Sequence, residues 1–374
     1  MADLVVKPVS GRRDKKLFLQ FPWTLYRDDP HWVPPLRANQ KELVGFRPHP
    51  FYAENEAQTF LAWRSGEVCG RIAAILNRRH NEHYGEQRGF FGFFDCRDDA
   101  EAAHALFDAV RRWFAERGIQ SLRGPTNPSL NYELGLLVEG FDSPPVFMMT
   151  YNPPYYARLL ESYGFRKSQD LYAYWGQIEM LPKIRERLGP LSRQIIERYD
   201  AKIRTLDKRH FLHDVELFLS IYNRSLGNTW GFVPMSPGEV THMAKALRYL
   251  IVPDLALGME VDGKPVGCVF CLPDYNPRIK QIDGRLFPFG FLRLLWNKKA
   301  IKRVRVITAN VVPEYQLLGL GLVLIDSLVP AALEWGIQEA EFSWVLESNA
   351  LSRGSLEKGG ALRTKTYRLY DFGP

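Results

Sequence analysis

The sequence predicts an α/β protein built from two copies of one structural unit. Three short patterns occur twice, and the second occurrences keep the order of the first. The pairs are RSGEVCGR (64–71) with VDGKPVGC (261–268), WFAERGIQSL (113–122) with ALEWGIQEAEF (332–342), and LLESYGF (159–165) with SLEKGGA (355–361). Because one repeat can arise by chance but three in order rarely do, we expect each copy to contain a hairpin, strand, helix, strand, helix and strand.

The elements of each copy follow from its turn residues and its aromatic runs. The first pattern places glycines and polar residues between apolar positions, as a β-hairpin requires. The third pattern is a helix end stopped by glycine, and an aromatic-rich strand follows it in both copies, as DLYAYW and as TYRLYDF. Inserts near Gly124–Met149 and Pro273–Lys302 account for the changing spacing between the copies.

Three ranges of the chain have distinct expected roles. Residues 1–178 hold the first copy behind a Pro- and Trp-rich lead-in that ends near Pro50. Residues 179–210 contain a charged helical connector, and residues 211–374 hold the second copy. The length is sufficient for two domains that each bury a core.

The composition favours a cytoplasmic protein with anionic partners. The 374 residues carry a formal net charge of +7, which suits phosphates, acidic lipids or nucleic acid. The first residues show no signal-peptide pattern, and no apolar run approaches the roughly 20 residues of a membrane span. The four cysteines suit a reducing compartment. No nucleic-acid module and no metal-ligand spacing accompany the basic residues, so we expect neither nucleic acid nor a metal.

A glycine turn joins a buried strand to a helix in the second copy. RVRVITANVV at 303–312 is β-branched and apolar, as a central strand requires. The helix from about Gly321 to Trp335 keeps its apolar residues at helical spacing. Gln316, Gly319 and Gly321 lie between the two, where glycines let main-chain N–H groups approach an anion at the helix start. Close packing of the helix is the alternative explanation.

The turn QLLGLG resembles the Q/R-x-x-G-x-G/A signature of the GCN5-related N-acetyltransferases (GNAT), in which it holds the pyrophosphate of coenzyme A. Asn349 and the helix end SLEKGGA resemble the next motif of that superfamily. GPTNPSLNYELGLLVEGFD, YNPPYY, GRLFPFGFLRLLW and VVPEYQ further resemble a bacterial group of tandem acyltransferases that includes ceramide synthases. The resemblance implies two tandem GNAT-like folds, each a mixed sheet flanked by helices, with acyl-CoA as the cosubstrate.

The resemblance implies that coenzyme A binds in the second copy only. The implied binding residues are Val311, Val312, Gln316, Leu317, Leu318, Gly319, Leu320, Gly321 and Asn349. The main-chain N–H groups near Val311 and Val312 are also the implied donors to the oxyanion. In the first copy the corresponding strand ends in Asp98 and Asp99, which would cap a helix but repel a pyrophosphate.

Two carboxylates are candidates for the base that accepts the proton of the amine. Glu347, at the end of the strand FSWVLE, is the first, and Glu314, beside the glycine turn, is the second. An exposed carboxylate at a strand end is the alternative for Glu347, and Glu314 is the weaker candidate. The tyrosine that often protonates the leaving thiol in the superfamily corresponds to Leu356 and Leu160, and a thiol with a pKa of about 8.5 needs little help to leave.

The first copy contains candidate ligands for the acceptor amine. NPSLNYELG (127–135) concentrates polar side chains between apolar runs, and loop polar groups held in this way often bind substrates. The candidates are Asn131, Tyr132, Glu133 and, from the following aromatic cluster, Tyr151. Turn capping is the alternative for the polar residues, and core packing is the alternative for the tyrosines.

The insert at 284–303, GRLFPFGFLRLLWNKKAIKR, mixes aromatic and aliphatic residues with arginines and lysines. This composition suits contact with an anionic membrane surface. An insert packed on its domain, with solvated lysines, is the alternative.

The sequence thus predicts an N-acyltransferase that moves an acyl group from acyl-CoA to a primary amine. A lipidic amine such as a sphingoid base is the first choice of acceptor. The second hypothesis for the function is an acetyl-CoA-dependent N-acetyltransferase that acts on small molecules or peptides. A non-catalytic coenzyme-binding module, favoured by the missing tyrosine, is the third. We expect the protein either free in the cytoplasm or peripheral at the inner face of the membrane.

Overall fold

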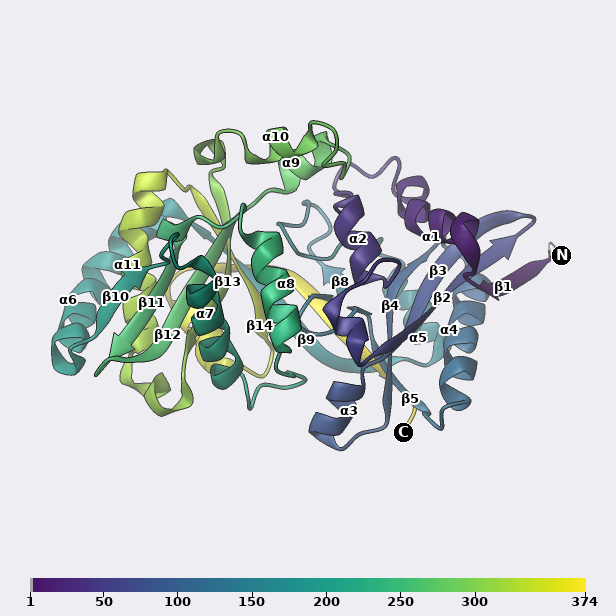
Figure 1. Cartoon of the computed structure of the whole chain (residues 1–374), viewed down its shortest axis with the longest axis horizontal. Helices are drawn as coiled ribbons and strands as arrows, with labels where there is room; N and C mark the ends of the chain where they lie inside the picture. The colour runs from purple at the N-terminus through teal and green to yellow at the C-terminus, as the bar shows by residue number, and fades with distance from the viewer. Residues whose placement is uncertain (1–2) are drawn as a thin grey trace. The chain divides into compact units, whose positions relative to one another are not determined.

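The computed structural model describes residues 3–374, without the side chains of residues 183, 184 and 187 (Figure 1). The chain forms two compact units that interleave along the sequence. Unit 1 contains residues 1–171, 276–294 and 365–374, and unit 2 contains residues 172–275 and 295–364. The division therefore passes through two strands, β9 (Arg166–Gln177) and β15 (Leu362–Phe372). The contiguous domain ranges 1–178 and 211–374 differ from these units and stay a prediction.

Unit 1 is built on a mixed sheet with helices on both faces. Its strands follow the order β1 (Leu4–Pro8), β2 (Glu56–Arg64), β3 (Glu67–Leu76), β4 (Arg88–Cys96) and β5 (Ser121–Gly124), and the end of β15 pairs with β5. Only β4 and β5 in this set run parallel. The helices are α1 (Gly11–Leu25), α2 (Arg37–Leu43), α3 (Arg78–Tyr84), α4 (Ala100–Ala115) and α5 (Tyr156–Tyr163).

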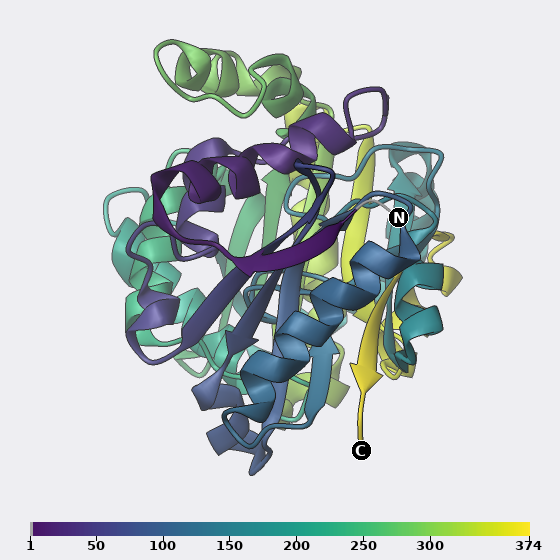
Figure 2. The ribbon, with the colours of Figure 1, turned by 90° about the vertical axis from the view of Figure 1, so that its right-hand side faces the viewer.

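The two faces of this sheet are covered by different helices. Side chains alternate along β3, so neighbouring residues point to opposite faces. A β-carbon on Gly70 would touch Leu106 of α4, whereas the guanidinium of Arg71 donates to the carbonyl of Phe18 in α1 at 2.8 Å. Figure 2 shows α4, in blue, and α1, in dark purple, on opposite sides of the strands of this sheet.

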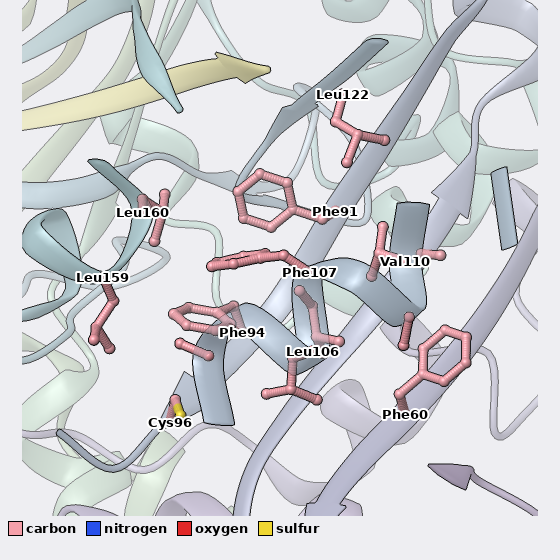
Figure 3. Packing of buried hydrophobic residues seen from close by; sticks show 14 of the residues in the cluster. Phe60, Phe91, Phe94, Cys96, Leu106, Phe107, Val110, Leu122, Leu159 and Leu160 are labelled. Atoms are coloured by element: carbon pink, nitrogen blue, oxygen red, sulfur yellow. The ribbon is translucent and has the colours of Figure 1, made fainter. Parts of the chain in front are cut away.

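The core of unit 1 lies between α4, α5 and the sheet. The helix α4 presents Leu106, Phe107 and Val110 to the sheet, and all three are fully buried (Figure 3). The ring of Phe107 stacks on Phe94 with centroids 5.0 Å apart. Leu160, which we expect at the position of the superfamily's tyrosine in this copy, is fully buried in the same cluster.

Unit 2 repeats this arrangement. Its strands follow the order β14 (Glu339–Leu346), β13 (Arg303–Val311), β12 (Lys264–Pro273), β11 (Ala256–Val261) and β10 (Lys202–Thr205), and only β13 and β14 run parallel. The helices are α6 (Leu181–Tyr199), α7 (Phe211–Ser225), α8 (Pro237–Leu247), α11 (Leu320–Trp335) and α12 (Ala350–Lys358). Leu324 of α11 approaches Gly267, and Phe218 of α7 approaches Gly258, so the two helices cover opposite faces.

The predicted repeat is confirmed element by element. The first copy reads β2–β3 hairpin, β4, α4, β5, α5 and β9, and the second reads β11–β12 hairpin, β13, α11, β14, α12 and β15. The predicted inserts contain the short strands β6 (Thr126–Asn127), β7 (Glu133–Leu134) and β8 (Leu136–Glu139) in the first copy, and the helices α9 (Asn276–Gln281) and α10 (Gly290–Leu295) in the second. The expected connector is α6 followed by β10, which both fall within unit 2.

The sequence predicts no membrane-spanning segment, and the helices of the structure can be compared with this prediction. Within residues 3–374, no helix combines the length and the apolar character needed to cross a bilayer.

Candidate active site

Two neighbouring strands of unit 2 pair along only part of their length. The parallel pairing of β13 with β14 ends at Val306, which lies opposite Phe342. Both strands continue beyond this point, β13 to Val311 and β14 to Leu346. Among the described residues, no strand pairs with 307–311 on the β14 side. Main-chain polar groups therefore face a gap between the two strands, and this gap leads to the glycine turn.

An extra residue in β13 bends this strand at the start of the gap. On its other side β13 pairs with β12, where Cys271 lies opposite Val306 and Phe270 lies opposite Thr308. Ile307 is therefore the additional residue of a β-bulge. A bulge bends its strand and re-aims the residues that follow. Because it directly follows the last residue paired with β14, it is the local cause of the divergence.

The residues at the end of β13 direct their N–H groups to opposite sides. The N–H of Val312 donates to the carbonyl of Val266 at 2.9 Å. This contact corrects the expectation that Val312 supplies an oxyanion donor, because its N–H is already used. Val311 precedes it in the same antiparallel register, so the N–H of Val311 points away from β12 and toward the gap.

The stretch between β13 and α11 is more regular than the expected turn. Pro313–Leu318 forms a 3-10 helix, and Gly319 then adopts a left-handed φ of 78°. A side chain would be strained at this φ, and a β-carbon would also lie 2.7 Å from Cδ1 of Ile195 on α6. Close packing and backbone conformation therefore explain Gly319.

Gly321 has more open surroundings. The nearest atom to a β-carbon at this position would be Cγ2 of Val311, at an ordinary contact distance of 3.9 Å. Gly321 lies in the first turn of α11, where N–H groups have no carbonyl partner within the helix. No main-chain carbonyl of the described residues accepts from the N–H groups of 319–321. These donors and the helix dipole suit an anion at this end of α11.

The remaining residues of the turn differ in exposure. The amide Nε2 of Gln316 donates to the carbonyl of Val311 at 3.0 Å and to that of Ser225 at 3.4 Å, so this side chain joins the turn to β13 and α7. Leu317 is 88% exposed, Leu318 is half-buried, and Leu320 is fully buried. The apolar side chains offer no hydrogen bonds, so contacts of these residues with a phosphate would come from the main chain.

The two candidate bases occupy different environments. Glu347 directly follows β14 and is half-buried, at the far end of the gap-lining strand. The side chain of Glu314 is 62% exposed and pairs with Arg224 of α7, with 3.3 Å between Oε1 and Nη2. Asn349 caps α12, because its Oδ1 accepts from the N–H of Ser352 at 3.0 Å. Its side-chain oxygen thus already has a structural partner.

A buried polar cluster lies beside the gap, and its residues are not among those predicted from the sequence. Arg305 on β13 donates through Nε to Oγ of Ser343 on β14 at 2.9 Å, and this hydroxyl donates to Oε1 of Glu341 at 2.7 Å. All three residues are at most 3% exposed. The guanidinium also lies 4.7 Å from the ring centroid of Trp344. The cluster joins the two strands around the last pair before they diverge. Its signal was the charge at alternate positions of the strand patterns RVRV and EAEF.

Two buried donors lie on the diverging parts of the strands. The side-chain Nδ2 of Asn310 on β13 and the Nε1 of Trp344 on β14 are buried and have no hydrogen-bond partner among the described residues. Burying an amide or indole N–H without an acceptor costs about 1–3 kcal/mol, so each such group in a folded protein requires an explanation. An acceptor on a bound ligand provides one.

Unit 1 has the same partial pairing, but its own chain fills the corresponding stretch. β4 pairs with β5 only as far as Phe90, and it continues to Cys96. A β-carbon on Gly92 would lie 1.7 Å from the carbonyl oxygen of Thr126. The N–H of Phe93 donates to Oδ1 of Asn127 at 2.6 Å. The strand β6 thus lies directly against the part of β4 that corresponds to the gap-lining part of β13.

The start of α4 in unit 1 is capped by its own carboxylate. Oδ1 of Asp99 accepts from the N–H of Ala102 at 3.1 Å, which confirms the predicted cap. The other Asp99 oxygen accepts from Nε of Arg64 at 2.9 Å. A negative group already occupies the helix start that would otherwise attract a phosphate.

The predicted acceptor ligands have structural contacts within unit 1. The N–H of Asn131 donates to Oγ of Ser129 at 3.3 Å, and Glu133 pairs with Asn127 between β7 and β6. Tyr132 is 8% exposed and packs edge-on against His49 with ring centroids 5.5 Å apart.

Tyr151 is fixed by a carboxylate in the same unit. Its hydroxyl donates to Oδ2 of Asp29 at 2.8 Å. Burial and then this carboxylate raise the pKa of the phenol. The phenol therefore stays neutral and already donates its proton to Asp29.

Comparison with known proteins identifies the family. No family model matches the chain. Over 98% of its length the chain is 34% identical to protein YghO of Escherichia coli K12, of which it covers 95%. Over 99% of its length it is 34% identical to the bacterial ceramide synthase of Caulobacter vibrioides, of which it covers 97%. The chain belongs to the bacterial ceramide synthase family. The resemblance found in its motifs is confirmed.

Solved structures confirm the tandem GNAT fold of this ceramide synthase family member. The chain aligns over its full length with 99% of a tandem GNAT protein from the clavulanic acid biosynthesis pathway, at a TM-score of 0.56 and 13% identity. It aligns over 99% of its length with 95% of a GCN5-related N-acetyltransferase from Sphaerobacter thermophilus, at 0.54 and 11%. At these identities the likeness shows the fold, and by family the chain is a GNAT-type acyltransferase. Among the described residues, no three His, Cys, Asp or Glu side chains gather as a metal site would require.

Proposed function

We propose that this protein transfers an acyl group from acyl-CoA to a primary amine, and that the reaction takes place in unit 2. One observation carries the proposal. The gap between β13 and β14 runs from a free-facing N–H at Val311 to the open helix start at Gly321. Acyl-CoA matches this path because its pantetheine chain carries hydrogen-bond acceptors along its length. It has a diphosphate at one end, for the helix start, and a thioester carbonyl at the other, for the N–H of Val311. In unit 1 the strand β6 lies against the corresponding part of β4, which supports placing the coenzyme in unit 2 only.

Different residues along this path bind different parts of acyl-CoA. The N–H groups at 319–321 and the dipole of α11 bind the diphosphate. Asn310 and Trp344 supply donors to the amide carbonyls of the pantetheine chain. The N–H of Val311 stabilises the oxyanion that forms on the thioester carbonyl. Gln316 acts through Val311, since it holds the carbonyl of that residue in place.

The chemical step needs a neutral amine and a proton acceptor. The amine nitrogen attacks the thioester carbonyl, a C–N bond forms, the C–S bond breaks, and coenzyme A leaves as a thiolate. We propose that Glu347 accepts the proton of the amine, with Glu314 as the weaker candidate because its side chain is more exposed. The thiolate needs little protonation to leave, which fits Leu356 in place of a tyrosine.

A lipidic amine such as a sphingoid base is the proposed acceptor. Support comes from the relative in Caulobacter vibrioides that is named a bacterial ceramide synthase and shares 34% of residues over almost the whole chain. The exposed aromatic residues of the insert at 284–303 add support, because they suit contact with a membrane. The proposal includes this contact and a location in the cytoplasm at the inner face of the membrane. Asn131, Tyr132, Glu133 and Tyr151 stay predicted acceptor-binding residues.

One assay tests the proposal and separates it from its rivals. Purified protein is mixed with acyl-CoAs from acetyl to palmitoyl and with either sphinganine or soluble amines, and the release of free thiol is measured. The proposal predicts release that depends on both a long-chain acyl-CoA and sphinganine. Turnover confined to acetyl-CoA with soluble amines would instead favour an N-acetyltransferase. Coenzyme binding without release in any combination would favour the non-catalytic module.

A further inference from the structure

We propose that unit 1 carries a docking surface for an anionic membrane, formed by an aromatic loop and a basic groove beside it. The aromatic loop is residues 285–292, which comprise the segment before α10 and the start of that helix, and the basic groove lies between α1 and α2. The inference deepens the proposed function, since a lipidic amine is reached from a membrane. Vesicle binding without acyl-CoA tests it separately from that function.

The aromatic loop exposes several large apolar side chains next to one another. Phe287 is 85% exposed, Phe289 70%, Leu292 52% and Phe291 43%. Single exposed apolar residues are common on soluble proteins, but a contiguous set of this size marks an interaction surface. The loop also carries Arg285, and Arg293 follows it, with no acidic residue between them.

The loop is folded, so this exposure is a fixed feature of its structure. The N–H of Phe291 donates to the carbonyl of Leu286 at 2.9 Å. A β-carbon on Gly290 would lie 1.8 Å from the carbonyl oxygen of Arg285, and one on Gly284 would lie 2.1 Å from that of Pro35. Glycine at both positions allows the chain to close on itself and on the segment before α2. The aromatic rings are therefore presented by a compact loop.

The basic groove lies on the same unit. It is a hollow of about 420 Å³, and the basic residues that line it are Arg12, Lys15, Lys16, Arg37, Lys41 and Arg47. No carboxylate lines it, and Trp23 and Phe46 form part of its wall. The ammonium of Lys15 lies 5.2 Å from the ring centroid of Phe46. Several cations over an apolar wall suit a phosphate headgroup with its hydrocarbon chain nearby.

Direct contacts join the loop to the groove. Nε1 of Trp23 donates to Oδ1 of Asp283 at 2.5 Å, and Nη2 of Arg37 donates to Oδ2 of the same carboxylate at 2.6 Å. The N–H of Arg37 also donates to the carbonyl of Gly284 at 3.0 Å. Two residues that line the groove thus hold the base of the loop. Figure 2 shows this insert, in green, next to the purple helices α1 and α2.

The combination of the two features selects an anionic bilayer as the occupant. Aromatic side chains partition into the headgroup region of a membrane, and lysines and arginines beside them are attracted to acidic lipids. The net charge of +7 adds a longer-range attraction of the same sign. A protein partner would need an apolar patch and an acidic patch at matching positions, whereas the surface of an anionic bilayer offers both features everywhere.

Vesicle co-sedimentation provides the test. One set of vesicles contains phosphatidylcholine with about one-third phosphatidylglycerol, and the other contains phosphatidylcholine alone. The full chain without acyl-CoA is expected to bind the first set, and added salt is expected to release it. The double variant Phe287→Ser/Phe289→Ser is expected to lower the partition coefficient about tenfold or more. The triple variant Lys15→Gln/Lys16→Gln/Lys41→Gln is expected to lower it on anionic vesicles by a similar factor.

Matched variants elsewhere control for hydrophobicity and charge. Tyr249→Ser removes an aromatic side chain that is 64% exposed, and Lys208→Gln/Lys264→Gln/Lys358→Gln removes three exposed lysines of unit 2. Both are expected to bind vesicles as the wild type does, and circular dichroism verifies that all variants fold. The inference is overturned if the wild type ignores anionic vesicles, or if the loop and groove variants bind as well as their controls. Binding of soluble glycerol phosphate without vesicle binding would also overturn it, because the groove would then serve a soluble anion.

Discussion

Gly319 and Ile195 lie in such close contact that a β-carbon on the glycine would be 2.7 Å from Cδ1 of the isoleucine. Gly319 is also left-handed, whereas Gly321 lies in ordinary helix with space around it. We therefore expect Gly319→Ala to lower the free energy of unfolding by about 1–3 kcal/mol. Gly321→Ala should leave this free energy unchanged or raise it slightly, because alanine favours helix. Urea unfolding of both variants measures the difference, and equal effects would contradict the separate roles of the two glycines.

The substitution Gly321→Glu tests the anion site without breaking the fold. A carboxylate in the first turn of α11 is compatible with the helix dipole, but it repels a diphosphate at the same N–H groups. We expect the affinity for coenzyme A to fall about tenfold or more, as measured by calorimetry. Leu333→Glu, which adds the same charge at an exposed position near the other end of α11, is the control and should keep the affinity. A Gly321→Glu protein with unchanged affinity would move the site elsewhere.

Much of the fold could be predicted because its signals are local. The helix expected from Gly321 to Trp335 is observed as Leu320–Trp335, and the strand expected at 303–312 as Arg303–Val311. The period of apolar residues and the punctuating glycines determine such elements within a short window. The repeated patterns then give the order of elements in both copies.

The features that shape the site depend on residues distant in sequence. The bulge at Ile307 is defined by its pairing with β12, and the tight contact of Gly319 is made by Ile195 from a separate helix. The occupied N–H of Val312 depends on the register with Val266. No window around the glycine turn contains these partners, so the sequence alone could not predict them.

Removing the amide of Asn310 should separate binding from stability. Its Nδ2 is buried without a partner among the described residues, so Asn310→Leu removes a desolvated donor and fills similar volume. We expect the free energy of unfolding to stay equal or to rise by about 1 kcal/mol, and the affinity for coenzyme A to fall about tenfold. Urea unfolding and calorimetry on one preparation measure both quantities. Loss of stability with full affinity would show that the amide serves the fold and not a ligand.

The filled stretch in unit 1 predicts one coenzyme site per chain. Asn127→Ala removes the acceptor of the Phe93 N–H, which we expect to lower the free energy of unfolding by about 1–3 kcal/mol. The stoichiometry of coenzyme A binding should stay at one per chain in the wild type and the variant. Two sites in the wild type, measured by calorimetry on protein of known active concentration, would contradict the assignment to unit 2.

Acid should destabilise unit 1 through His80. Burial among Tyr84 and Phe90 lowers the pKa of His80 to about 4, although the nearby carboxylate of Glu86 opposes this effect. The unfolded value is about 6.5, so the unfolded chain binds the proton more readily. The free energy of unfolding is therefore not lowered by His80 above pH 6.5. As the pH falls from 6.5 toward 4, protonation of His80 in the unfolded chain lowers it by up to about 3 kcal/mol. His80→Phe should remove this part of the pH dependence of unfolding, and an unchanged dependence would assign it to other groups.

A crystal structure of the protein in complex with a non-hydrolysable acyl-CoA analogue would show whether the coenzyme binds in the gap between β13 and β14. We expect the diphosphate to lie against the N–H groups of residues 319–321, and the carbonyl of the thioester analogue to lie within hydrogen-bonding distance of the N–H of Val311. We also expect hydrogen bonds from Asn310 or Trp344 to the pantetheine chain. A coenzyme bound in unit 1, or one that leaves the gap between β13 and β14 empty, would contradict this placement.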